Sequence, residues 1–352
     1  MTPPHRSARG WIGKVLLLLL LVLAAAATLA WLDYQRFART PLPLPDEGVV
    51  LEVPRGQSLR GIVGQLAERG LTPAWRRHWW QALAVDDGVL RRLQAGEYLL
   101  EPGLDPRGLL DQLARGRVIQ YRFTIVEGWT FADLRRALAG QAAVTQTVSD
   151  QADAQVMAML GREGEHPEGW FLPETYTYRR GTSDLDLLRQ AHEAMRQALD
   201  QAWAGRSEAS VVASPYEALI LASIIEKETG VADERRRIAG VFSRRLAIGM
   251  RLQTDPTVIY GIGSGFDGNL RRRDLDTDTP YNTYTRAGLP PTPIALPGRA
   301  ALAAALDPAP GRELYFVALG DGSGGHDFSE TYAQHQAAVR RYLARLRGGS
   351  GR

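Results

Sequence analysis

The longest apolar stretch of the chain lies close to its start. Residues 15–32 carry no charge, and as an α-helix they would extend about 27 Å, close to the thickness of a bilayer core. Trp11 and Trp31 flank the stretch as interfacial tryptophans do, with basic residues before it and an acidic residue after it. The pattern predicts a single transmembrane helix at 15–32, a cytoplasmic tail at 1–14 and an extracytoplasmic remainder. A cleaved signal peptide is the alternative, because residues 28–30 resemble a cleavage site.

Alternating prolines follow the apolar stretch and predict a semi-stiff linker over residues 33–46. Beyond it, three glycine turns each lead through a Ser, Thr or Asp into apolar residues spaced four apart, the pattern of a capped helix. Residues 47–120 have the predicted order strand, helix, helix, strand, helix. This order resembles the LysM-like modules, which are small glycan-binding folds. Trp75, Trp79 and Trp80 of the second helix either stack on sugar or belong to the core.

Residues 121–346 are predicted to form a second, larger domain. Residues 141–161 are polar and Ala-rich, which favours a helical insertion, and residues 184–205 are typical of a helix. The Ser-Pro-Tyr-Glu sequence at 214–217 predicts a capping box with proline in the first turn. An almost wholly apolar run follows and indicates a helix buried on all sides, with Gly230 placed to end it. The fold class is therefore α+β, with a flexible tail at 347–352.

Composition narrows the classes of protein. The 352 residues are 45% hydrophobic and 23% charged, which is ordinary globular usage and predicts about two domains. Cysteine is absent, which excludes disulfides and thiol nucleophiles, and no residue spacing argues for a metal or a cofactor. The net charge is +3, but basic residues gather at both ends and the remainder is slightly acidic. A nucleic-acid partner is therefore not expected.

Two carboxylates at the end of the buried helix are the main candidates for chemistry. Ala222 and Ser223 precede Glu226 by one turn and are small, so we expect room for a ligand beside Glu226. Glu228 follows isoleucines and would be crowded. Burial and the negative end of the helix dipole both favour the protonated form of Glu226, which suits a general acid. Lys227 points away around the helix. The alternative is a helix end that simply emerges into solvent.

The same helix carries the first of several motifs that resemble a known family. Residues 221–229 (LASIIEKET) resemble the catalytic motif of the endolytic murein transglycosylases, the YceG-like family. Further blocks resemble the family in the same order, at residues 241–250, 251–261, 280–284, 288–294, 314–318 and 325–329. Upstream, residues 127–130 and 169–176 also resemble it. The resemblance covers nearly everything after residue 47.

The resemblance implies an enzyme and a mechanism. Glu226 would be the catalytic acid/base that cleaves the β-1,4 bond between N-acetylmuramic acid and N-acetylglucosamine and leaves a 1,6-anhydro end. It also implies peptidoglycan synthases and division or elongation proteins as partners, and a place at the cell membrane on nascent strands. No second carboxylate is then required, unlike in ordinary glycoside hydrolysis.

Other residues are expected around the acid. Asp255 is the rival carboxylate, and because it precedes a proline we expect extended or turn backbone there. Sugar contacts are expected from a group of polar side chains that also have ordinary structural uses: Gln253, Asp255, Tyr281, Asn282, Tyr284 and Glu174. Two other functions stay open. One is a hydrolytic muramidase that uses Glu226 and Asp255 as a pair, and the other is a non-catalytic scaffold that binds peptidoglycan.

Overall fold

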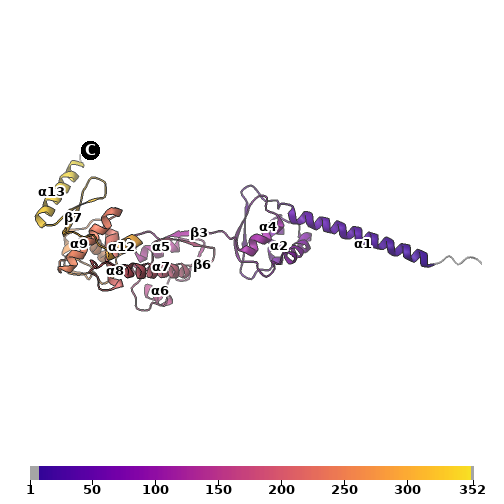
Figure 1. The fold of residues 1–352 in the computed structure, drawn as a ribbon, viewed down its shortest axis with the longest axis horizontal. Coiled ribbons are helices and arrows are strands. Elements are labelled where there is room, and N and C mark those ends of the chain that lie inside the picture. Colours follow the sequence, from indigo (N-terminus) through magenta and orange to yellow (C-terminus); the bar gives the residue numbers. More distant parts are fainter. Residues whose placement is uncertain (1–7, 350–352) are drawn as a thin grey trace, which may run out of the picture. The chain divides into compact units, whose positions relative to one another are not determined.

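The computed structural model describes residues 8–349 and divides the chain into two compact units, residues 1–120 and 121–352 (Figure 1). Helices dominate both units, and the strands of the described residues form four two-stranded sheets. The architecture is therefore a mixture of helices and strands. Residues 1–7 of the expected cytoplasmic tail and residues 350–352 of the expected C-terminal tail lie outside the described residues.

The first unit begins with α1 (Ala8–Arg39), the long indigo helix of Figure 1. The part Trp11–Arg39 has a mean hydropathy of 2.8 in its most apolar window, and none of that window is buried in the protein, so it is long and apolar enough to cross a membrane. The structure differs from the expected linker at residues 33–39, which continue α1 without a break. Tyr34, Phe37 and Ala38 are buried there because they face the core of the module that follows.

That module is built on one antiparallel strand pair. It comprises β1 (Val49–Val53), α2 (Leu59–Glu68), the 3₁₀ turn η1 (Ala74–Arg76), α3 (Arg77–Asp86), β2 (Gly96–Leu100) and α4 (Pro106–Arg115). β1 pairs with β2 in the register Val49↔Leu100. Ser58 and Asp105 cap α2 and α4 by accepting hydrogen bonds from backbone N–H groups. Trp80 lies fully inside the core that these elements enclose.

The second unit opens with a strand pair and the helices around it. β3 (Tyr121–Thr124) pairs with β5 (Thr175–Tyr178), and α5 (Phe131–Ala139) starts at a capping box on Thr130. The expected helical insertion is only partly helical: it contains β4 (Val144–Thr145) and α6 (Asp153–Met159). β4 pairs in parallel with β6 (Thr182–Ser183), and α7 (Asp184–Ala204) follows.

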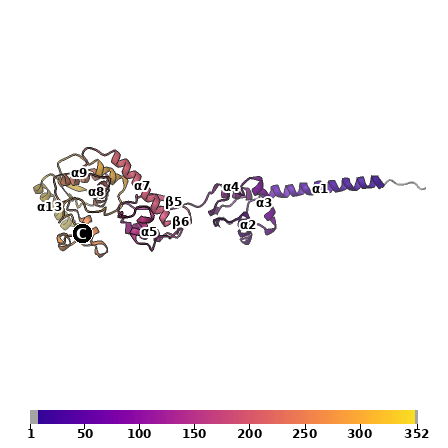
Figure 2. The same ribbon diagram turned by 90° about the horizontal axis from the view of Figure 1, so that it is seen from below.

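The remaining elements surround one buried helix, α8 (Pro215–Glu228). They comprise η2 (Ala232–Glu234), α9 (Arg235–Ala247), α10 (Asp255–Ile262), η3 (Gly263–Gly265), α11 (Arg272–Asp276), α12 (Arg299–Leu306), β7 (Tyr315–Ala318), β8 (His326–Ser329) and α13 (Tyr332–Gly349). α8 packs against α7, α9, α10 and α12, so its residues 218–225 are all buried. Figure 2 labels α8 with its neighbours α7 and α9. The expected tail is helical as far as Gly349.

The two ends of α8 are set by local chemistry. Ser214 caps the first turn by accepting from the Glu217 N–H at 3.2 Å, whereas the Glu217 carboxylate accepts from Ala213 and so departs from the expected capping box. At the other end the helix stops because Thr229 is extended, with φ −145° and ψ 135°. Gly230 is therefore not the stop that the sequence suggests. The last turn of α8 presents Glu226.

Candidate active site

Glu226 is half-buried at the carboxyl end of α8, next to the amino end of α12. Its Oε2 accepts a hydrogen bond of 2.8 Å from the backbone N–H of Gly298, the residue that caps α12. Among the described residues no group hydrogen-bonds the other oxygen, Oε1. One carboxylate oxygen is thus held by the protein while the other is available to a substrate.

The small residues before Glu226 make room for protein and not for a ligand. Ser223 is buried, and its Oγ accepts from the N–H of Ile294 at 3.0 Å and donates to the carbonyl of Ile220 at 2.7 Å. The buried segment 294–297 lies in the space that the small side chains leave. The chain therefore contacts Ser223 on this face of α8, and the same segment leads to Gly298 beside Glu226.

A second carboxylate, which the sequence analysis missed, lies at the same place. A Cβ added to Gly298 would clash with Oε1 of Glu127, so the Glu127 carboxylate lies directly against Gly298. Glu127 lies on the loop before α5, and two backbone hydrogen bonds hold this loop to the segment before α12. The N–H of Gly128 donates to the carbonyl of Leu296, and the N–H of Leu296 donates to the carbonyl of Trp129. The only signal in the sequence was that Glu127 belongs to one of the family-like blocks.

The surrounding charges act on the pKa of Glu226 in both directions. Burial raises the pKa above its usual value, the Gly298 N–H lowers it, and the negative charge of Glu127 raises it again. Arg235 and Lys227 lower the pKa by smaller amounts. Lys227 donates through Nζ to the carbonyl of Gly128 at 3.1 Å, so its ammonium group holds the loop that carries Glu127. The net result is a carboxyl that stays protonated at higher pH than an exposed glutamate.

Glu228 belongs to a different cluster, on the side of α8 that faces α10. Its carboxylate accepts from the hydroxyl of Thr254, and burial raises its pKa to about 7, with the nearby charge of Asp255 acting in the same direction. Asp255 in turn accepts from the Tyr284 hydroxyl at 2.5 Å. α10 begins at Asp255, so this residue lies in the first turn of a helix and not in the extended or turn backbone that we expected.

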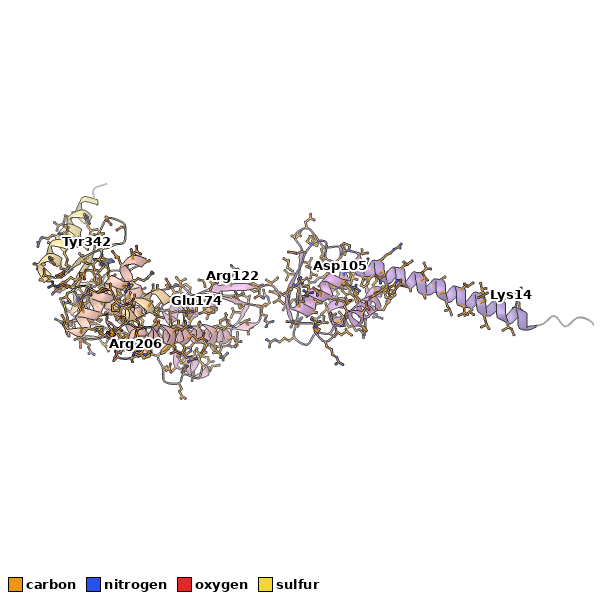
Figure 3. The ribbon with its side chains drawn as sticks, in the orientation of Figure 1. Lys14, Asp105, Arg122, Glu174, Arg206 and Tyr342 are labelled. Carbon is orange, nitrogen blue, oxygen red and sulfur yellow. The ribbon has the colours of Figure 1, made fainter. Side chains whose placement is uncertain are left out.

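The other expected contact residues divide into exposed and internal groups. Gln253 is exposed and has a left-handed φ of 51°, which costs a non-glycine residue about 1–2 kcal/mol. Glu174 is also exposed and pairs with Arg299 at 2.8 Å, beside Gly298 (Figure 3 labels Glu174). Tyr281 shares a hydrogen bond of 2.9 Å with Thr292.

Asn282 is the most enclosed of the expected contacts. Its side-chain NH₂ donates to the carbonyls of Asp274, Leu275 and Thr277, and its oxygen accepts from the N–H of Tyr284. Only 1% of the residue is exposed. Its amide is fully used within the chain, so the geometry supports a role in shaping the loop before Tyr284 and leaves no group for a sugar.

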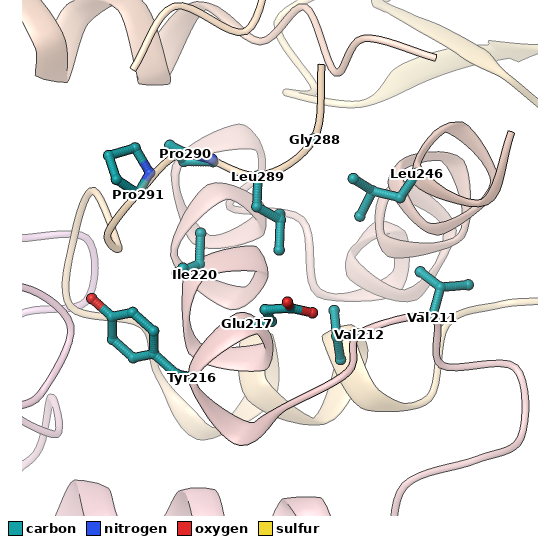
Figure 4. A pocket seen from close by; sticks show the side chains of 10 residues that line it. All are labelled: Val211, Val212, Tyr216, Glu217, Ile220, Leu246, Gly288, Leu289, Pro290 and Pro291. Carbon is teal, nitrogen blue, oxygen red and sulfur yellow. The ribbon is translucent and has the colours of Figure 1, made fainter. Parts of the chain in front are cut away.

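An apolar hollow of about 390 Å³ lies at the opposite end of α8 (Figure 4). Val212, Tyr216 and Ile220 line it together with Leu289 and Pro290, and the carboxylate of Glu217 lies among these side chains. Glu217 and Glu226 are nine residues apart on one helix, which places them about 13 Å from each other along its axis. This hollow therefore does not contain the candidate acid.

Glu226 is a half-buried carboxyl with a raised pKa, and the protein hydrogen-bonds one of its two oxygens. This arrangement suits a general acid/base. The chain matches the YceG-like family over residues 51–341 and belongs to that family. It is 30% identical over 313 residues to an endolytic murein transglycosylase of Bacillus subtilis (strain 168), covering 84% of this chain and 85% of that protein.

Two further comparisons agree with this membership. An endolytic murein transglycosylase of Streptococcus pneumoniae serotype 2 is 28% identical over 258 residues, covering 64% of this chain and 46% of that protein. The crystal structure of a YceG-like protein from Listeria monocytogenes superposes with a TM-score of 0.52 at 28% identity. That superposition covers 83% of this chain and 99% of the other, so the fold is shared over most of its length.

Proposed function

We propose that this protein is an endolytic lytic transglycosylase that cleaves the glycan strands of peptidoglycan with Glu226 as its only catalytic carboxyl. Relatives with the name endolytic murein transglycosylase support the enzyme class and the substrate. The observation that carries the residue assignment is the hydrogen bond from Gly298 to one oxygen of a half-buried Glu226. Because the other oxygen is free among the described residues, a substrate oxygen can meet it.

The chemistry requires one proton to move out and one to return. Protonated Glu226 donates its proton to the glycosidic oxygen as the bond from that oxygen to C1 of N-acetylmuramic acid breaks. The carboxylate that remains accepts the proton of the C6 hydroxyl while O6 bonds to C1, which gives the 1,6-anhydro end without consuming water. Gly298 and the amino end of α12 stabilise the transient carboxylate. The charge of Glu127 favours the protonated resting state.

The location follows from the first unit. α1 would anchor the protein as a single-pass helix with the N-terminus in the cytoplasm and both units outside, as the charge pattern predicts. The strand–helix–helix–strand order of residues 49–100, with its antiparallel pair, supports a LysM-like module. Cleavage would then occur on nascent strands near the membrane, beside peptidoglycan synthases and the division or elongation proteins.

The hydrolytic muramidase is less well supported. Asp255 is bonded to Tyr284 and acts electrostatically on Glu228, whereas the carboxylate that affects Glu226 is Glu127. Asp255 therefore acts with Glu228 and Tyr284, which does not support its use as the partner of Glu226 in hydrolysis. A non-catalytic scaffold would not need the raised pKa of Glu226, so this function is also less well supported.

Uncrosslinked glycan strands incubated with the full-length protein test the proposal, with product ends identified by mass spectrometry. We expect anhydro ends from the wild type and a loss of about 10²–10⁴-fold with Glu226→Gln, the range for a general acid/base. Asp255→Asn is the matched control and should retain anhydro products. Ends heavier by one water would favour the muramidase, and equal cleavage by Glu226→Gln would contradict the role of Glu226. No cleavage by any of the three proteins would favour the scaffold.

A further inference from the structure

The apolar helix and the module form one continuous piece of structure. Trp11 and Trp31 are separated by 20 residues of α1, about 30 Å, which equals the thickness of a bilayer's hydrocarbon core. Both rings are largely exposed, with Trp31 at 60%. The helix continues for two more turns and ends in the module core at Phe37 and Ala38. With α1 crossing the bilayer as proposed above, the module starts at the depth where the lipid headgroups begin.

Side chains of the module contact the part of α1 that follows Trp31. Asp33, two residues beyond Trp31, pairs with Arg76 at 3.5 Å and accepts from Nε1 of Trp79 at 2.8 Å. The Trp79 ring also packs against Tyr34, with ring centroids 5.4 Å apart. These contacts fix the corner between η1 and α3 beside the first turn of α1 outside the membrane.

The corner has the chemistry of a membrane interface. The Trp75 ring is 62% exposed, and the guanidinium of Arg76 lies over it at 4.9 Å. Arg77 and His78 are exposed on the same corner, and Arg36 is exposed on α1 nearby. Tryptophan rings and arginines are the side chains that prefer the headgroup layer, and each arginine near an anionic surface contributes attraction.

The neighbouring acidic groups do not cancel this charge. Asp33 is paired with Arg76, and Arg107 is shared by Asp86 at 3.4 Å and Asp87 at 3.2 Å. The arginines at positions 36, 76, 77 and 107 exceed these three aspartates by one, so the corner keeps a small net positive charge. A role in sugar stacking is less well supported, because Trp80 is buried and Trp79 is bonded to Asp33, which leaves Trp75 as one isolated ring.

We propose that residues 74–78, here named the collar, bind anionic lipid headgroups and hold the module against the outer surface of the membrane. The inference rests on α1 crossing the bilayer, as proposed above. Its consequence is that the module does not move freely on a linker. The collar fixes its tilt, and thereby fixes the height above the membrane at which the chain leaves the module.

Site-specific labels test the collar cleanly because the chain has no cysteine of its own. A fluorophore on Ala74→Cys, which keeps Trp75, reports on the collar in the full-length protein reconstituted in vesicles. Leu20→Cys reports on the span, and Arg115→Cys, at the other end of the ten-residue α4 from Pro106, is the matched control on the module. The quenchers are lipids that carry a nitroxide on the headgroup or bromine on the acyl chain.

We expect headgroup quenching at residue 74 to exceed that at residue 115 several-fold in vesicles that contain phosphatidylglycerol. Trp75→Ala combined with Arg77→Gln should remove most of this difference, and so should neutral phosphatidylcholine vesicles at high salt. Equal quenching at residues 74 and 115, with acyl-chain quenching at residue 20 intact, would overturn the collar alone. Absence of quenching at residue 20 would overturn the anchor and the collar together. Protection of residue 74 by glycan oligosaccharides, without headgroup quenching, would assign the corner to sugar instead.

Discussion

Glu226 lies where the carboxyl end of one helix meets the amino end of another. The negative end of the α8 dipole disfavours its charge, and the positive end of the α12 dipole, through the Gly298 N–H, favours it. Burial and Glu127 add to the first effect. An acid that must release a proton and then recover it requires this balance, because neither form can be held too tightly.

Glu127 can be tested by its effect on the pH dependence of cleavage. Its charge raises the pKa of Glu226, so Glu127→Gln should lower that pKa. Glu226 must be protonated to act as the acid, and the alkaline limb of the kcat/KM profile should therefore move to lower pH. Because Glu127 is exposed, solvent screens its charge, so the limb should move without disappearing.

Glu193→Gln supplies the matched control. It removes the same charge from a half-buried site on α7, where Glu193 pairs with Arg196, so the alkaline limb should stay in place. An unchanged limb in Glu127→Gln, or an equal shift in both variants, would contradict a local action of Glu127 on Glu226. A uniform loss of rate at every pH would instead assign Glu127 to substrate contact.

At the level of elements, Ser223 connects α8 to the segment that carries Gly298. Its hydroxyl satisfies the buried N–H of Ile294, so Ser223→Ala leaves that donor without a partner. We expect a loss of about 1–3 kcal/mol in the free energy of unfolding, measured by urea denaturation. The rate of cleavage should fall as well, because the segment that contains Ile294 also positions Gly298, which donates to Glu226.

Ser243 offers a matched control within α9. It is 3% exposed, and its hydroxyl has no hydrogen-bond partner among the described residues. Ser243→Ala should therefore be neutral or slightly stabilising. If both serine variants lost the same stability, the bridge to Ile294 would not be the cause of the effect at Ser223.

The sequence was informative about local structure and silent about the partners of Glu226. The start of α8 followed from Ser214 and Pro215, and Glu226 was proposed as the acid from its buried helix and its family-like motif. Gly298 lies 72 residues further along the chain, however, and Glu127 lies on a loop before α5. Neither position carries a local pattern that indicates its neighbour. The small side chains before Glu226 were noticed, but only packing shows that chain segment 294–297 occupies the space they leave.

On the scale of the molecule, the first half of the expected linker, residues 33–39, is the end of a helix that belongs to the module. Tyr34, Phe37 and Ala38 have the helical spacing i, i+3, i+4 and form part of the first core. The prolines at residues 41–45 predicted an extended linker, but they lie beyond Arg39, where α1 ends. The first unit therefore includes residues on both sides of the expected boundary.

Two shortened proteins distinguish a helix that completes the module from a helix that only tethers it. A protein that begins at Asp33 keeps the three buried residues, whereas one that begins at Pro41 lacks them. Loss of a buried aromatic side chain costs about 3–5 kcal/mol, which is a large part of the stability of a small module. In calorimetry, the longer protein should unfold in two transitions, one for each compact unit. In the shorter protein the transition of the module should disappear or move to a much lower temperature. The transition of the second unit should stay in place, because residues 121–352 form a compact unit of their own. Identical transitions in the two proteins would show that residues 33–40 are a tether after all.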